Sequence, residues 1–172
     1  MLNFIKHRDH ALMLRIHHWE PPDGLRLVMV SATRAGDGWL WYGLGLLILM
    51  FGDHDRVAAV FAGTSATSVG LVIYALLKQA TRRPRPCLVE PNRWAHILPP
   101  DQYSFPSGHT IAAFAITMSV GQFYAPLFMV LLLAALLIAS SRILLGMHYL
   151  SDVIAGMVLG GALGHLAFRL IS

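Results

Sequence analysis

The chain has 172 residues, a formal net charge of +4, and a composition that is 56% hydrophobic and only 13% charged. Soluble domains are on average about half apolar and a quarter charged, so this composition excludes an ordinary soluble protein and makes the lipid bilayer the main solvent. Because apolar segments separate the basic residues, which form no continuous stripe, we expect anionic lipid headgroups as partners and not nucleic acid.

The N-terminal part of the chain is amphipathic. Two such stretches, residues 4–19 and 25–33, are separated by the helix-breaking segment Glu20-Pro21-Pro22-Asp23-Gly24. We predict two helices here that lie in the membrane interface or are partly inserted.

Five apolar blocks follow, at residues 39–51, 57–77, 110–124, 126–145 and 149–171. Each should be a helix, because a backbone that crosses lipid must satisfy its own hydrogen bonds. The first block is short for a span of ~20 residues. The sequence therefore predicts an all-α, integral-membrane helical bundle with about five spans. We expect one domain, 1–172, in which 1–37 holds the interfacial helices and 38–172 the bundle.

The number of blocks predicts which polar segments share a membrane face. If each block crosses once, the connection 78–109 and the region 141–152 emerge on the same face, because two blocks separate them. That face also carries the N-terminal segment, while Arg56 and Arg169 are the basic residues left to the opposite face. Most ionisable groups should therefore gather at one end of the bundle.

A first polar cluster follows the second block. It begins with Lys78 and ends in Arg85-Pro86, with a further proline just before the arginine. A guanidinium binds two phosphate oxygens at once, and the lysine adds a point charge. The alternative is a positive anchor of the kind that ends many membrane spans.

A second cluster, Pro106-Ser107-Gly108-His109, opens the third block. Free amides at a helix start favour an anion, and Ser107 can cap the helix. Gly108 allows close approach of the backbone, and His109 can act as a general acid beside a bound phosphate. The alternative is a simple serine cap followed by an interfacial histidine.

A third cluster runs from Ser141-Arg142 through Gly146 to His148 and Asp152. His148 and Asp152 are four residues apart, which places them on one helix face. A nucleophile or base oriented by a carboxylate has this arrangement. The alternative is a structural pair at the interface, but ionisable residues within a membrane chain usually serve function.

The three clusters together resemble the three-part motif of the type 2 phosphatidic acid phosphatase (PAP2) superfamily. Its members include bacterial undecaprenyl pyrophosphate and phosphatidylglycerophosphate phosphatases, and the soluble vanadium haloperoxidases are relatives. The motif reads Lys, six residues, Arg-Pro; then Pro-Ser-Gly-His; then Ser-Arg, five residues, His, three residues, Asp, and the chain matches every position.

The resemblance implies a fold and a role for each motif residue. The fold is a haloperoxidase-like phosphatase core. His148 is the implied nucleophile, Asp152 its orienting carboxylate, and His109 the acid that protonates the leaving group. The implied phosphate-binding residues are Lys78, Arg85, Ser107, Gly108 and Arg142.

The expected function is a metal-independent lipid phosphatase that acts through a phosphohistidine, with no cofactor and no metal site. The resemblance favours a polyprenyl (undecaprenyl) pyrophosphate as substrate. Four alternatives stay open: a phosphatidylglycerophosphate or phosphatidic acid phosphatase, a lipid phosphotransferase, a non-enzymatic lipid-binding or transport component, and haloperoxidase chemistry. The sequence predicts no oligomeric state.

The expected location is the bacterial inner (cytoplasmic) membrane. The excess of Lys and Arg on the predicted site face argues for the cytoplasm by the positive-inside rule. Bacterial members that the chain resembles act mostly on the periplasmic side, and we expect that side.

Overall fold

The computed structural model describes residues 2–90, 94 and 101–172, so part of the predicted 78–109 connection lies outside the described residues. The described residues form helices and no β-strand, which confirms the predicted all-α fold. The helices in chain order are α1 (Leu2–His18), α2 (Asp23–Ala35), α3 (Trp39–Phe51), α4 (Arg56–Thr81), α5 (Pro86–Val89), α6 (Gly108–Phe123), α7 (Ala125–Leu144) and α8 (Leu150–Ile171).

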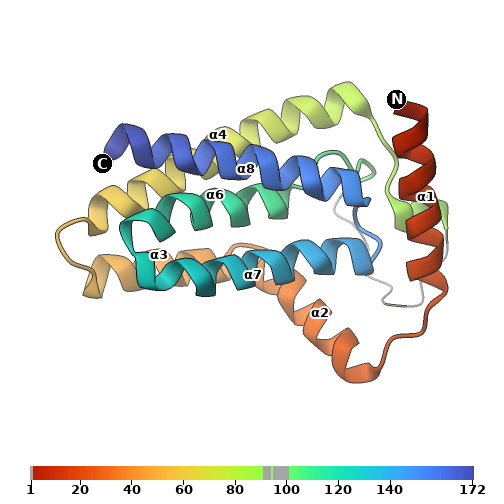
Figure 1. Ribbon diagram of the computed structural model, residues 1–172, viewed down its shortest axis with the longest axis horizontal. Helices are drawn as coiled ribbons and strands as arrows, with labels where there is room; N and C mark the ends of the chain where they lie inside the picture. Colours follow the sequence, from red (N-terminus) through yellow and green to blue (C-terminus); the bar gives the residue numbers. More distant parts are fainter. Residues whose placement is uncertain (1, 91–93, 95–100) are drawn as a thin grey trace.

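The long helices run along a common direction (Figure 1), and α6 lies at their centre, packed against α4, α7 and α8. Most of α6 is buried, and apolar residues lie on all sides of it, as expected of a core helix. Helix α1 stands across one end of the bundle, and α2 runs obliquely from that end to pack against α7. The N-terminus lies at this end and the C-terminus at the other.

Among the described residues, three helices are long and apolar enough to cross a membrane: α4, α7 and α8. Helix α3 has 13 residues and α6 has 16. At 1.5 Å per residue these two are about 20 and 24 Å long, shorter than a hydrocarbon core of ~30 Å. The predicted blocks thus match five helices within a few residues, whereas the number of spans stays a prediction.

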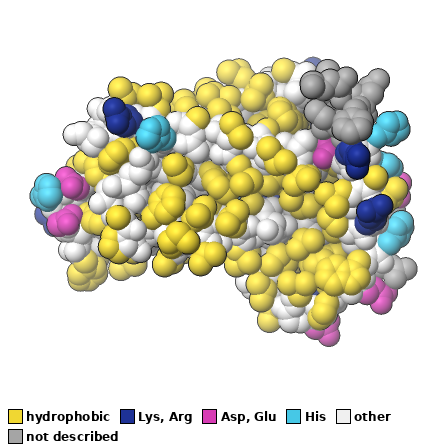
Figure 2. Space-filling view, viewed as in Figure 1, with side chains coloured by type: hydrophobic (Ala, Val, Ile, Leu, Met, Phe, Trp, Pro, Cys, Tyr) yellow, Lys and Arg dark blue, Asp and Glu magenta, His cyan; other side chains and the backbone are white. Residues whose placement is uncertain are grey.

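The outer surface of the bundle is strongly apolar between its ends (Figure 2), and charged side chains gather at both ends in this view. Large exposed hydrophobic side chains lie on four of the long helices, for example Leu46, Val72, Leu133 and Val158. An apolar band flanked by charged ends is the surface that a bilayer requires.

Glycines on α8 bring its backbone into contact with α6. Gly156, Gly160 and Gly164 recur every four residues, and a Cβ atom at Gly160 would lie 2.3 Å from the carbonyl oxygen of Ile111. This spacing of small residues allows close helix packing in membranes. The contact also sets the register of two motifs, because the Ser107 amide donates to the Asp152 carbonyl oxygen at 3.1 Å.

Candidate active site

The third motif forms the turn between α7 and α8. Gly146 has a positive φ of 69°, and the amides of Met147 and His148 both donate to the Arg142 carbonyl oxygen at 3.0 Å. A glycine adopts this left-handed conformation without steric cost. The turn directs the His148 side chain inward, where 2% of the residue is exposed.

The partners of the His148 imidazole define its tautomer. Its Nδ1 lies 2.5 Å from the Ser104 carbonyl oxygen, and its Nε2 lies 3.2 Å from Nη1 of Arg85. A carbonyl only accepts and a guanidinium only donates, so we assign the proton to Nδ1 and a lone pair to Nε2. The unprotonated nitrogen therefore faces a cation, where a phosphate would bind.

Burial keeps this imidazole neutral. Desolvation lowers the pKa of His148 to about 3; the Asp152 carboxylate acts in the opposite direction, and the charges of Arg142 and Arg85 lower the pKa further. The side chain is therefore uncharged at neutral pH. A neutral imidazole with a free lone pair is the form that can attack phosphorus.

Asp152 is fully buried beside this imidazole. One carboxylate oxygen, Oδ2, accepts from the Tyr149 amide at 2.9 Å and lies 3.8 Å from Nδ1 of His148, and the other accepts from Arg83 at 2.7 Å. The carbonyl of Ser104 thus takes the hydrogen-bonding position that we expected Asp152 to hold. Arg83 also pairs with Asp9 at 2.8 Å, which ties α1 to the third motif.

The two cations of the first motif are buried and share one carboxylate. Arg85, 1% exposed, donates to the Met147 carbonyl at 2.9 Å, and to the Asp101 carbonyl and carboxylate at 2.8 and 3.1 Å. Lys78 is bonded to the other carboxylate oxygen of Asp101 and to the Tyr74 hydroxyl.

The pKa of Asp101 reflects these two neighbours. Burial alone would raise the pKa of the carboxyl, but the bond from Lys78 and the charge of Arg85 lower it below its usual value. Asp101 is therefore ionised at neutral pH and occupies the donors that we predicted for phosphate.

The second motif lies at the start of α6. Ser107 is fully buried and its hydroxyl accepts from Thr110 at 2.9 Å, while Gly108 packs so close to Tyr74 that a Cβ atom would lie 3.2 Å from its ring. The first-turn amides of a helix lack intrahelical partners. Nε2 of His109 lies 2.7 Å from Oδ1 of Asp37.

Arg142, from the last turn of α7, completes the set of cations. It is 5% exposed, and one terminal nitrogen donates to the hydroxyl of Thr33 on α2. Its Nε is buried and has no hydrogen-bond partner among the described residues. An unsatisfied buried donor is costly unless a ligand accepts from it.

The structure brings the predicted residues of all three motifs to one end of the bundle. It also adds residues that sequence reasoning missed. Thr33, Asp37, Asp101 and the Ser104 carbonyl contact motif residues directly. Asp37 had a weak signal, since it is an acidic residue between two glycines next to an apolar block; the others had none.

An apolar cavity of about 440 Å³ starts at this end of the bundle. Asp37, Gly108 and His109 line it at the site end, and it extends between α3, α4 and α6. Its apolar wall includes Trp41, Leu44, Ile48, Val60, Ile116 and Val120. His109 thus borders both the polar site and a space suited to hydrocarbon.

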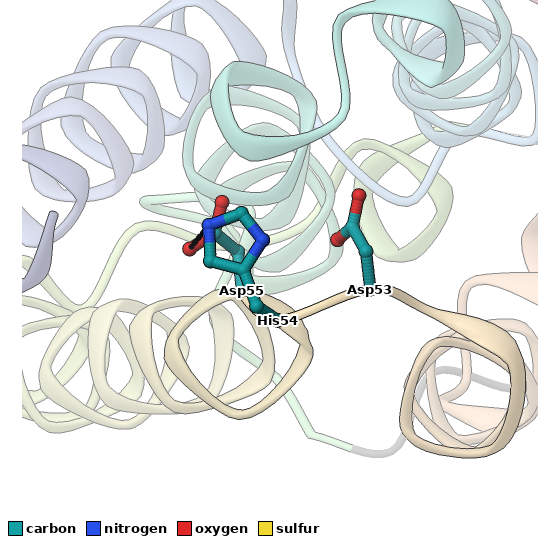
Figure 3. A group of neighbouring side chains, drawn as sticks. All are labelled: Asp53, His54 and Asp55. Carbon is teal, nitrogen blue, oxygen red and sulfur yellow. Dashed lines mark ion pairs between the residues drawn. The ribbon is translucent and has the colours of Figure 1, made fainter.

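A second polar group lies in the turn between α3 and α4, at the other end of the bundle (Figure 1), and Figure 3 shows its three side chains. Asp53, His54 and Asp55 have potential ligand atoms within 4.8 Å of one another, and His54 pairs with Asp55 at 3.1 Å. These side chains are largely exposed. An exposed turn of this kind does not by itself indicate a metal site.

The chain belongs to the PAP2 superfamily, whose family model matches residues 58–172. It is 36% identical to the decaprenylphosphoryl-5-phosphoribose phosphatase of Mycobacterium tuberculosis over 127 residues, which cover 74% of this chain and 68% of the relative. It is 35% identical over 127 residues to the undecaprenyl-diphosphatase BcrC of Bacillus subtilis, covering 72% of this chain and 64% of that protein.

Two solved structures have the same fold. The transmembrane PAP2-type phosphatidylglycerolphosphate phosphatase of Bacillus subtilis matches with a TM-score of 0.77 and 22% identity, over 98% of this chain and 86% of that one. LpxE of Aquifex aeolicus matches with a TM-score of 0.72 and 24% identity, over 92% of this chain and 93% of that one.

These findings confirm the family that the motifs indicated. The protein is a membrane enzyme of the PAP2 lipid phosphatase family, and it hydrolyses phosphate esters.

Proposed function

We propose that the protein is a metal-independent lipid phosphatase that transfers the terminal phosphoryl group of a polyprenyl pyrophosphate to His148 and then to water. The observation that carries this proposal is the position of the His148 imidazole, whose Nε2 lies 3.2 Å from a terminal nitrogen of the buried Arg85 guanidinium. Nucleophile and phosphate-binding cation are thereby adjacent.

The first step forms a covalent intermediate. The phosphoryl oxygens take over the donors of Lys78 and Arg85 that Asp101 occupies, and the unpaired Nε of Arg142 adds another. These charges stabilise the equatorial oxygens of the transition state. A P–N bond to Nε2 of His148 forms as the P–O bond to the leaving group breaks, and His109 gives its proton to the leaving oxygen.

The second step releases the product. A water molecule gives its proton to His109 and its oxygen attacks phosphorus, and the P–N bond breaks to return neutral His148. Inorganic phosphate leaves, and Asp101 can bind the cations again. No metal is required in this scheme, because Lys78, Arg85 and Arg142 supply the positive charge and would repel a bound cation.

The apolar cavity supports a lipid as substrate. His109 lines its mouth, so a leaving group protonated by His109 would carry its hydrocarbon chain into the space between α3, α4 and α6. Each buried methylene contributes about 0.8 kcal/mol. The names of two relatives, a decaprenylphosphoryl-5-phosphoribose phosphatase and an undecaprenyl-diphosphatase, support a polyprenyl chain.

We further propose that the chain is one domain in a bacterial inner membrane, with the site end facing the periplasm. Residues 1–37 would form its interfacial part and 38–172 its catalytic bundle. Contacts from Thr33 and Asp37 to motif residues support a single folded unit. Labelling of Cys87 by a membrane-impermeant thiol reagent in intact spheroplasts would support this orientation, and labelling in inverted vesicles alone would contradict it.

The test of function is phosphate release by the purified protein. We expect the highest kcat/KM with a polyprenyl pyrophosphate, lower values with phosphatidylglycerophosphate and phosphatidic acid, no loss of activity in EDTA, and inhibition by vanadate. Binding of these lipids without phosphate release would identify a binding protein. Turnover that requires an acceptor lipid would identify a phosphotransferase, and either result would overturn the proposal.

A further inference from the structure

The second motif has a carboxylate partner that lies outside all three motifs. Oδ1 of Asp37 and Nε2 of His109 are 2.7 Å apart, although 72 residues separate them in the sequence. The Asp37 side chain is 55% exposed and the His109 side chain 23%. A half-exposed pair in the mouth of a cavity is accessible to a ligand, and an occupying lipid would exclude water from it.

The backbone around Asp37 is built for this contact. A Cβ atom at Gly36 would lie 3.0 Å from Cδ2 of His109 and 3.0 Å from Cγ2 of Ile138, so only glycine fits without displacing the imidazole. Gly38 has a φ of 119°, a conformation that side chains rarely adopt. The two glycines thus allow the turn between α2 and α3 to pack closely against the start of α6.

We propose that Asp37 is a positioning residue for His109, the general acid and base of the reaction; this rests on the function proposed above. The Asp37 carboxylate accepts a hydrogen bond from Nε2–H of His109. Nδ1 of the same ring is then left to protonate the leaving oxygen. Burial lowers the pKa of His109, the charges of Arg142 on α7 and of Arg85 lower it further, and the Asp37 carboxylate opposes them.

The proton movements are consistent with this role. In the first step Nδ1–H of the imidazolium passes its proton to the leaving oxygen, and the neutral ring keeps its Nε2–H bonded to Asp37. In the second step Nδ1 accepts a proton from the attacking water. The carboxylate therefore keeps one tautomer through both steps and does not itself change protonation state.

The substitution Asp37→Asn tests the charge while preserving an acceptor oxygen for Nε2–H. With a lipid alkyl phosphate, whose leaving oxygen needs a proton, we expect kcat/KM, which reports the first step, to fall about tenfold and the alkaline limb of its pH profile to move to lower pH. With p-nitrophenyl phosphate, whose leaving group departs without a proton, kcat/KM should change less than about twofold. The matched control is Asp23→Asn, an exposed carboxylate on α2, which should leave both rates unchanged.

Two further variants make the result decisive. If Asp37 acts through His109, the double variant Asp37→Asn/His109→Ala should be no slower than His109→Ala alone, and Asp37→Glu should recover part of the lipid rate. Equal loss on both substrates without a shift of the pH profile would overturn the role and indicate a structural contact. Activity that survives in His148→Ala would instead overturn the proposed function, so the two failures are distinguishable.

Discussion

The two ends of the bundle carry the same kinds of residues in opposite environments. At the site end His148 is 2% exposed and Arg85 1%, and both contact other ionisable groups. At the other end the His54 side chain is 86% exposed, and Arg56 and Arg169 are exposed as well. Charges that remain in water cost little, whereas buried cations are costly unless an anion accompanies them. The site end is therefore the one prepared for a phosphate.

Two carboxylates accompany the cations of the site end. Asp101 pairs with both Lys78 and Arg85, while Asp152 pairs with Arg83. The carboxylates neutralise cations that would otherwise repel one another at close range. Under the proposed function, substrate and Asp101 would compete for the guanidinium group of Arg85 and the ammonium group of Lys78.

The largest difference between the ends should appear in matched histidine substitutions. His148→Ala removes the nucleophile and should lower the rate of phosphate release by at least about 10³-fold. His54→Ala at the far end should leave the rate within about twofold, since an exposed surface substitution rarely matters. Similar losses in the two variants, or none in either, would remove the functional distinction between the ends.

Substitutions at two adjacent glycines of α8, a helix that runs between the two ends, test how closely α8 packs against α6. Gly160→Ala would place a Cβ atom 2.3 Å from the Ile111 carbonyl oxygen, whereas the neighbouring Gly161 has 3.8 Å to its nearest atom, on Met118. Overpacking costs about 1–3 kcal/mol, so the Gly160 variant should melt several degrees lower. The Gly161 variant should melt at or above the parent temperature, as alanine favours helix. Thermal unfolding in detergent measures both; equal Tm values would contradict the close packing of α6 and α8.

The smallest expected effect concerns the shared carboxylate. Asp101→Asn leaves Lys78 and Arg85 without their anion, and since Asp101 is partly exposed we expect a loss of about 1 kcal/mol, or about 2–4 °C in Tm. Phosphate or vanadate should restore more stability to this variant than to the parent. Asp55→Asn should change neither quantity. A variant that binds vanadate more weakly than the parent would show that Asp101 supports anion binding and does not compete with it.

Much of the fold followed from the sequence, because each long helix is an apolar run bounded by charges, glycine or proline. The blocks at 57–77 and 149–171, for example, correspond to α4 and α8. The convergence of Lys78, Arg85 and His148 followed from the parity of crossings between them. The packing of α6 against α8 brings the second and third motifs together, because its register places the Ser107 amide within hydrogen-bond distance of the Asp152 carbonyl oxygen.

The remaining contacts could not be predicted because they depend on tertiary geometry. The Ser104 carbonyl that holds His148 is a backbone atom, which any residue would supply. Thr33 and Asp37 reach the site only because α2 folds back along α7, which no local pattern specifies. Trp94, which lies in the polar connection between two apolar blocks, is fully buried against Met29 and Leu145.

The central claim is that phosphorus becomes bonded to His148. The most direct measurement is rapid quenching in base of the enzyme mixed with substrate carrying a radiolabelled terminal phosphate, followed by mapping of the labelled peptide. We predict an acid-labile, alkali-stable label on residue 148 that is absent from His148→Ala. A turning-over enzyme that gives no such label, or carries it on another residue, would contradict the account.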